Sequence, residues 1–129
     1  MCELVYILVG VAGSLGAILR YLVGVLMAGQ DTVFPFSTLT VNLLGSFVLA
    51  WLTVGLFKKI TRLSAQIKTA IGTGFVGSFT TFSTLSVETV MLWQQERMAL
   101  AVLYILASLL GGLVLSKAGF LVGERMNAR

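Results

Sequence analysis

The stretch GTGFVGSFTTFSTLSVE, residues 72–88, decides how the fold of this chain is interpreted. It begins with three glycines and then interleaves phenylalanines with hydroxyl side chains. The hydroxyls are Ser78, Thr80, Thr81, Ser83, Thr84 and Ser86. The whole chain is 57% hydrophobic, and this most polar run lies inside a segment that is otherwise apolar enough to cross a membrane.

Four apolar blocks of about 20 residues each divide the 129-residue chain, and each is long enough to cross ~30 Å of hydrocarbon as a helix. Only 11% of the residues are charged, against about 25% in a typical soluble domain. We therefore predict an all-α integral membrane protein with a single transmembrane domain, residues 1–129. The four transmembrane helices are expected over residues 4–27, 37–57, 69–93 and 99–122.

The composition also excludes several functions. Cys2 is the only cysteine, so neither an internal disulfide nor a cysteine metal cluster is expected. The chain has no histidine, the commonest metal ligand and proton shuttle. No acid–base pair or activated nucleophile is recognisable, so we expect no enzyme. The net charge of +4 is assigned to membrane topology rather than to nucleic-acid binding.

Basic residues are distributed unevenly between the two expected sides of the membrane. Arg97 is alone on one side, once Arg20 is set aside because it lies inside a helix. The other side has seven: Lys58, Lys59, Arg62, Lys68, Lys117, Arg125 and Arg129. Because cytoplasmic loops are enriched in Lys and Arg, both termini are expected on the cytoplasmic side of a prokaryotic plasma (inner) membrane.

The third helix is expected to be broken near residues 77–81, close to the middle of the membrane. Gly72, Gly74 and Gly77 weaken the helix, and the hydroxyls of Thr80 and Thr81 compete for backbone acceptors. Irregular backbone at that depth is tolerated only where protein, water or an ion satisfies it, so a break indicates an ion site. The alternative is that these hydroxyls bond back to their own helix.

Polar residues in the other helices leave alternatives open. Arg20 is either an interfacial anchor or an anion-attracting vestibule residue, and Glu88 is either a vestibule carboxylate or interfacial. Asn42 either joins two helices or contacts a polar passenger. A stripe on the fourth helix, which includes Tyr104 and Ser108, is either small-residue packing or a track of donors. The small residues Gly10, Gly13 and Gly16 favour close helix packing.

Three stretches resemble the Fluc family of small fluoride channels: GSLGAILRY in the first helix, TLTVN in the second and GFVGSFTTFST in the third. The resemblance covers essentially the whole chain. It implies an antiparallel (inverted) dimer of four-helix subunits, through which fluoride leaves the cytoplasm passively and gives fluoride resistance. It also implies a structural Na⁺ at the dimer centre, held by the backbone carbonyls of Gly77 and Thr80.

The same resemblance assigns roles to side chains. It places Arg20 and Glu88 in the vestibule. It places an ion pathway along Asn42, Phe82, Ser83, Thr84, Tyr104, Ser108 and Ser116, with Leu85 at the position of the family's second pore phenylalanine. A leucine has no electropositive ring edge to offer an anion, so a pore that depends on it should conduct poorly.

Two departures from the family bear on assembly. Leu85 replaces a phenylalanine, and Gly112 replaces a serine of the helix-four stripe. The strong charge bias also opposes insertion in both orientations, which pairing with itself requires. The partner is therefore either a second copy of the chain or, as we hypothesise, an oppositely oriented paralogue.

Two rival functions are weighed. A small multidrug-type, proton-coupled exporter needs a carboxylate within its first helix, and Glu3 lies only at its very start. A non-conducting partner subunit of a heteromeric channel would explain the glycines but not the aligned hydroxyls.

Overall fold

The computed structural model describes residues 2–29 and 33–128, and this part of the chain is helical apart from short connections and contains no strand. The first helix is α1 (Cys2–Met27). The second segment consists of α2 (Phe36–Trp51), π-helix η1 (Leu52–Leu56) and α3 (Phe57–Lys59). The third consists of α4 (Ala65–Thr69), π-helix η2 (Ala70–Val76), α5 (Gly77–Phe79) and α6 (Phe82–Gln94), and the fourth is α7 (Met98–Asn127). Arg129, used in the charge comparison, lies outside the described residues.

Three helices are long and apolar enough to cross a membrane: Glu3–Met27, Phe36–Lys59 and Met98–Asn127. The third predicted segment is interrupted at Thr80 and Thr81, between α5 and α6. The 13 residues of α6 extend only about 20 Å at 1.5 Å per residue, too little to cross alone. The predicted all-helical architecture is therefore confirmed for the described residues, with three continuous candidate spans and one discontinuous segment.

The second segment, expected from residue 37, starts beside the proline of the preceding connection. Pro35 occupies the N-cap position, and α2 begins at Phe36. The carbonyl of Pro35 accepts the Leu39 N–H at 3.2 Å, which is the first helical bond. At the other end of the chain α7 continues five residues beyond the predicted end, to Asn127.

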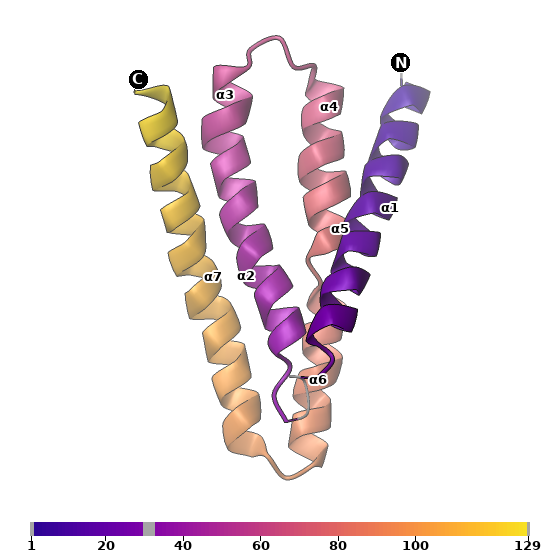
Figure 1. The fold of residues 1–129 in the computed structure, drawn as a ribbon, viewed down its shortest axis with the longest axis vertical. Helices are drawn as coiled ribbons and strands as arrows, with labels where there is room; N and C mark the ends of the chain where they lie inside the picture. The colour runs from indigo at the N-terminus through magenta and orange to yellow at the C-terminus, as the bar shows by residue number, and fades with distance from the viewer. Residues whose placement is uncertain (1, 30–32, 129) are drawn as a thin grey trace.

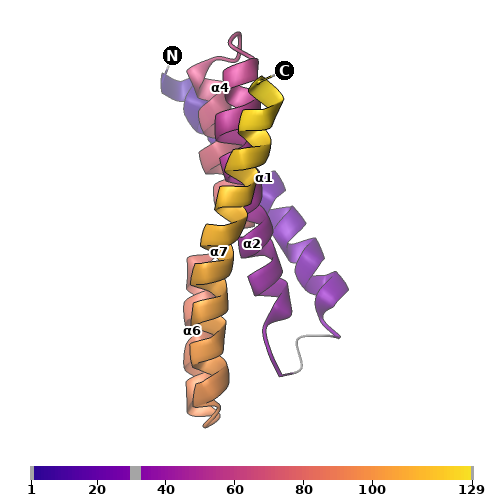
Figure 2. The same cartoon turned by 90° about the vertical axis from the view of Figure 1, so that its left-hand side faces the viewer.

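The segments form two packed pairs (Figures 1 and 2). In one pair α1 runs beside η2 and α5, and in the other α2 runs beside α7. Beyond the break, α6 lies against α7, whereas the lower parts of α1 and α2 lean away in Figure 2. The break therefore lets one segment pack first on α1 and then on α7. Both ends of the described chain and the α3–α4 connection lie at the same end of the molecule.

Glycines make the closest helix contacts. A Cβ added at Gly16 would lie 3.0 Å from the carbonyl carbon of Phe75, and one at Gly74 would lie 2.8 Å from the carbonyl oxygen of Val9. These two glycines let α1 and η2 approach backbone to backbone, as small residues do between membrane helices. The packing interpretation thus holds for Gly16, whereas a Cβ at Gly10 would meet nothing within 4 Å in this chain.

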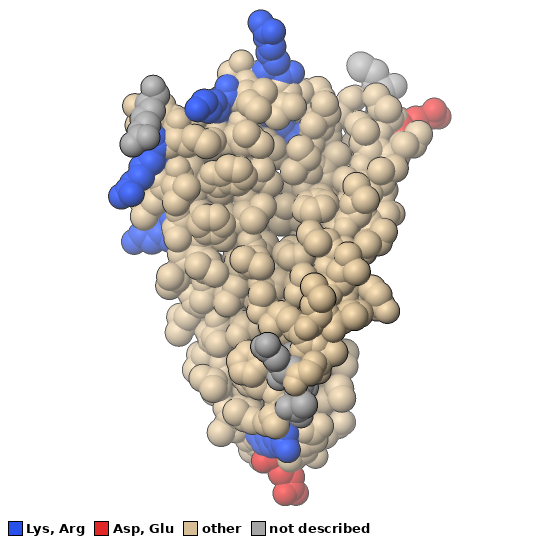
Figure 3. All heavy atoms as spheres, viewed as in Figure 1, with Lys and Arg blue, Asp and Glu red and all other residues tan. Residues whose placement is uncertain are grey.

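In the view of Figure 3, charged side chains lie toward the two ends of the molecule, and those of the upper end continue down one edge. Lysine and arginine gather at the end that carries the termini, and the band between the ends is uncharged on this face. Large apolar side chains point outward along this band, for example Leu113 of α7, which is 69% exposed. Such a surface fits a hydrocarbon environment.

Candidate functional site at the helix break

The chain changes from helix to extended backbone for two residues. Thr80 still donates its N–H to the Val76 carbonyl at 3.0 Å, but its ψ of 161° turns the next residue out of the helix. Thr81 is extended, with φ −150° and ψ 127°. The carbonyl of Gly77, which would receive the Thr81 N–H in a continuous helix, instead accepts a long bond of 3.4 Å from the Thr80 hydroxyl.

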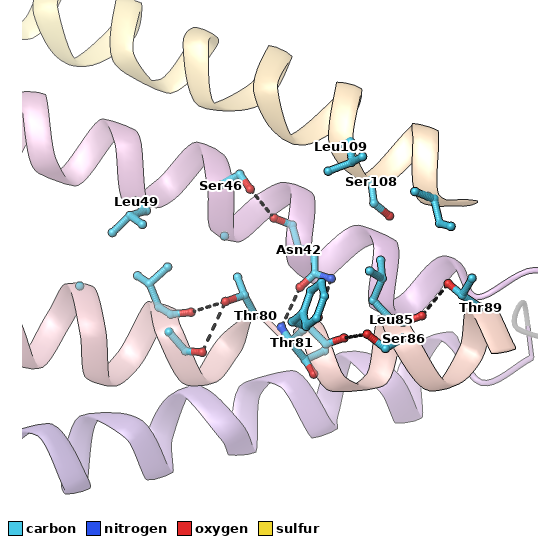
Figure 4. Close-up of a pocket in the computed structure, with 16 residues that line it drawn as sticks. Asn42, Ser46, Leu49, Thr80, Thr81, Leu85, Ser86, Thr89, Ser108 and Leu109 are labelled. Carbon is cyan, nitrogen blue, oxygen red and sulfur yellow. Dashed lines mark hydrogen bonds between the residues drawn. The ribbon is translucent and has the colours of Figure 1, made fainter. Parts of the chain in front are cut away.

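Asn42 of α2 binds the polar groups that the break releases (Figure 4). Its Oδ1 accepts the Thr81 N–H at 2.8 Å, and its Nδ2 donates to the Thr81 carbonyl at 2.9 Å. Within the described chain this amide joins two helical segments. The backbone of Thr81 thus donates one of these bonds and accepts the other.

The hydroxyls of residues 78–86 do not share one task. Thr81 caps α6, because its Oγ1 accepts the Thr84 N–H at 3.2 Å. Thr80 and Ser86 bond back to carbonyls of their own helices, at 3.1 and 2.9 Å. Bonding back to the same helical segment, the alternative stated for this stretch, therefore holds for Thr80 and Ser86. Thr81 instead caps the helix that follows the break.

A cavity of about 710 Å³ lies beside the break, between α2, the η2–α5 segment, α6 and α7 (Figure 4). Six predicted site residues line it: Asn42, Gly77, Thr80, Phe82, Leu85 and Ser108. The Ser108 hydroxyl is buried and makes no hydrogen bond within the described part of the chain. Phe82 is 80% exposed, whereas Phe79, three residues earlier, is buried. The break therefore separates the phenylalanine row that a continuous helix would have aligned.

A second cavity of about 230 Å³ lies between α1, α2 and α6. Arg20, Thr84 and Glu88, three further predicted site residues, line it together with Thr38. The guanidinium of Arg20 donates to the Thr80 carbonyl at 3.3 Å. Arg20 therefore connects α1 to the break as well as facing this cavity.

Glu88 is held by two hydroxyls from other helices. Oε1 accepts from Thr38 at 2.9 Å, and Oε2 accepts from Tyr104 at 2.6 Å. Tyr104 is fully buried and packs edge-on against Phe34, with ring centroids 5.4 Å apart. Its hydroxyl therefore faces Glu88 and not the larger cavity.

Three predicted pathway residues line neither cavity: Ser83, Tyr104 and Ser116. Three contributors that sequence reasoning did not select as site residues are Thr38, Ser46 and Thr81. A signal for Thr38 existed, because it lies one turn before Asn42 on the same helix face. A signal for Thr81 was its position three residues before Thr84, the spacing of a hydroxyl cap.

Backbone carbonyls, rather than side chains, are the groups at this site that suit a metal ion. No group of three or more His, Cys, Asp or Glu residues that could hold a metal occurs among the described residues. Gly77 is exposed and offers a carbonyl without its usual helical donor. Thr80 offers a second, shared with Arg20. Two carbonyl oxygens are compatible with an alkali cation in chemistry but are too few to enclose one.

Comparison with known proteins places this geometry in a family. The family model described as "CrcB-like protein, Camphor Resistance (CrcB)" matches residues 7–120. This chain belongs to that family. The family match spans every residue of the break and of both cavities.

Relatives with curated names cover nearly the same length. The chain is 60% identical to "Fluoride-specific ion channel FluC 1" of Desulfitobacterium hafniense over 111 residues, 86% of this chain and 96% of the relative. It is 48% identical to "Fluoride-specific ion channel FluC 1" of Bacillus cereus over 125 residues, 96% and 90% of the two chains. It is also 48% identical to "Fluoride-specific ion channel FluC 2" of Geobacillus kaustophilus over 122 residues, 94% of each. The resemblance stated from the sequence is confirmed.

Proposed function

We propose that the protein is a fluoride-selective channel that lets fluoride leave the cytoplasm passively, and that it is not an enzyme. The observation that carries the proposal is the 60% identity, over 86% of the chain, to a relative named a fluoride-specific ion channel. The larger cavity supports it, because hydroxyl, amide and aromatic groups line an otherwise apolar space.

The groups around this cavity suit a small, strongly hydrated anion. Conduction requires donors that replace water without holding the ion too tightly. Ser108 offers an uncommitted hydroxyl, and Phe82 offers the electropositive edge of an exposed ring. Neutral donors of this kind bind an anion more weakly than a buried cation would, which permits release.

The channel is an antiparallel dimer in this proposal, with four transmembrane segments per subunit and the third broken near mid-membrane. Phe82 and Gly77 both lie exposed on one chain, as expected for groups that a second subunit covers. The carbonyls of Gly77 and Thr80 would hold a structural Na⁺ at the dimer centre, completed by the same groups of the partner. That ion would supply a fixed positive charge beside the anion path.

Two partners fit the dimer: a second copy and an oppositely oriented paralogue. The charge asymmetry favours the paralogue, with both termini of this chain in the cytoplasm of a prokaryotic cell. The relatives carry numbered names, FluC 1 and FluC 2, which accords with paralogous subunits. In such a pair, Leu85 would leave one pore poorly conducting and the other intact.

Fluoride efflux from proteoliposomes tests the function. Two preparations are compared in fluoride-loaded vesicles: the purified chain alone, and the chain co-purified with an oppositely oriented relative. At least one of the two is expected to release fluoride. Release of chloride from matched vesicles is the control and should stay at the protein-free rate. Equal passage of both ions, no fluoride release in either arm, or proton-coupled drug uptake would overturn the proposal.

A further inference from the structure

Both polar atoms of the Asn42 side-chain amide are hydrogen-bonded to the backbone of one residue, Thr81. Extended backbone directs the N–H and C=O of a residue such as Thr81 sideways, where a neighbouring strand would pair with them. Asn42 supplies that pair of partners from α2, at 2.8 and 2.9 Å. We propose that Asn42 is a positioning residue that keeps the Thr80–Thr81 break extended and thereby leaves the Gly77 carbonyl without its helical donor.

The competing conformation is a continuous third helix. Thr81 is only 9% exposed, so its backbone groups have little access to water and need partners within the protein. Without the Asn42 amide, the nearest alternative acceptor along the chain for the Thr81 N–H is the Gly77 carbonyl four residues earlier. Thr81 would then alternate between an extended state whose N–H is unpaired and open to exchange and a helical state in which this bond occupies the Gly77 oxygen.

Close packing of α2 against the break brings Asn42 within reach of Thr81. Gly45, one turn further along α2, lies against Thr80, and a Cβ there would overlap the Thr80 side chain. The hydroxyl of Ser46 donates to the Asn42 carbonyl at 2.9 Å. The absence of a side chain at Gly45 therefore brings α2 close enough for an asparagine to reach across.

The positioning role leaves room for a direct role in conduction. An amide nitrogen carries two hydrogens, and Thr81 takes one of them. The other remains for an occupant of the larger cavity, which Asn42 also lines. Only the consequence for a cation at Gly77 rests on the proposed function; the consequence for the backbone does not.

Hydrogen exchange of the Thr81 amide, followed by NMR on the full chain with ¹⁵N-labelled threonine, tests the proposal directly. The wild-type Thr81 amide is expected to be protected although it lies at a break. Asn42→Ala should accelerate its exchange on the order of tenfold, with threonine amides away from the break, such as Thr53, as the internal reference. Ser108→Ala removes a polar group from the same cavity and should leave Thr81 exchange at the wild-type rate.

Asn42→Asp separates positioning from ion binding. A carboxylate still accepts the Thr81 N–H, so Thr81 amide exchange should stay slower than in Asn42→Ala. Fluoride efflux should fall in both variants. The sodium arm compares melting temperatures in Na⁺ and in N-methylglucamine. The Na⁺-dependent rise expected for wild type and Ser108→Ala should be lost in Asn42→Ala.

Each outcome has one meaning. Wild-type Thr81 exchange in Asn42→Ala overturns the positioning role, even if that variant conducts no fluoride. Should Asn42→Ala fail to fold, the wild-type measurement decides, because an unprotected Thr81 amide is incompatible with the proposal. Expected exchange results without fluoride efflux from wild type would overturn the proposed function and leave the positioning role standing.

Discussion

The phenolic hydroxyl of the fully buried Tyr104 donates to Oε2 of the half-buried Glu88 across 2.6 Å, which joins α7 to α6. Tyr104→Phe removes this donor and keeps the ring against Phe34. Because hydrogen bonds to charged groups are the stronger ones, we expect a loss of about 1.5–3 kcal/mol of stability, seen as a lower melting temperature in detergent.

The matched control is Tyr21→Phe. Tyr21 is 72% exposed on α1, so removal of its hydroxyl should leave the melting temperature nearly unchanged. Equal effects of the two substitutions would contradict the importance of the Tyr104–Glu88 bond. A large loss of fluoride efflux in Tyr104→Phe without any loss of stability would instead place Tyr104 on the ion path.

The sequence predicted an all-helical membrane protein but not how the polar backbone groups of Thr81 are satisfied. Apolar blocks fix where membrane helices lie, and glycine and threonine at 77–81 mark the weak point, because those properties are local. The Asn42–Thr81 pair and the Tyr104–Glu88 bond join residues 39 and 16 positions apart. Their geometry depends on how the helices pack, which one chain's residue pattern does not specify. The third helix also changes neighbours at the break, which separates Phe79 from Phe82.

Gly16 is expected to be intolerant of a side chain. A Cβ there would lie 3.0 Å from the Phe75 carbonyl carbon and 3.1 Å from the Phe79 amide nitrogen, both rigid backbone atoms. Gly16→Ala should therefore push α1 from the break-bearing segment and lower stability by about 1–3 kcal/mol. Gly10→Ala is the control, since a Cβ there meets nothing within 4 Å, and alanine favours helix over glycine. Thermal unfolding of the two variants should shift in opposite directions or, for Gly10→Ala, not at all.

Arg20 should influence the break through the Thr80 carbonyl, to which it donates at 3.3 Å. Arg20→Gln removes the charge from the smaller cavity and is expected to lower fluoride efflux several-fold. Arg20→Lys keeps the charge but replaces the planar donor fork with one ammonium group, so it should restore efflux only in part. Arg97→Gln, at the α6–α7 connection, removes one positive charge far from the break in sequence and serves as the control. Equal efflux from Arg20→Gln and Arg97→Gln would contradict a role for Arg20 at the break.

Leu85→Phe is expected to increase fluoride efflux several-fold in the preparation that releases fluoride, whether that is the chain alone or the chain with its oppositely oriented partner. Leu85 lines the larger cavity three residues after Phe82 and also packs against the cluster around Tyr104, so a ring there adds an electropositive edge beside an existing one. Leu109→Phe adds the same ring to the same cavity from α7 and should not raise efflux, because Leu109 lies on another helix than Phe82 and does not occupy the position three residues after it. Chloride efflux should stay at the protein-free rate in both variants. If fluoride efflux through Leu85→Phe is no faster than through wild type or through Leu109→Phe, then Leu85 does not limit fluoride conduction by this subunit.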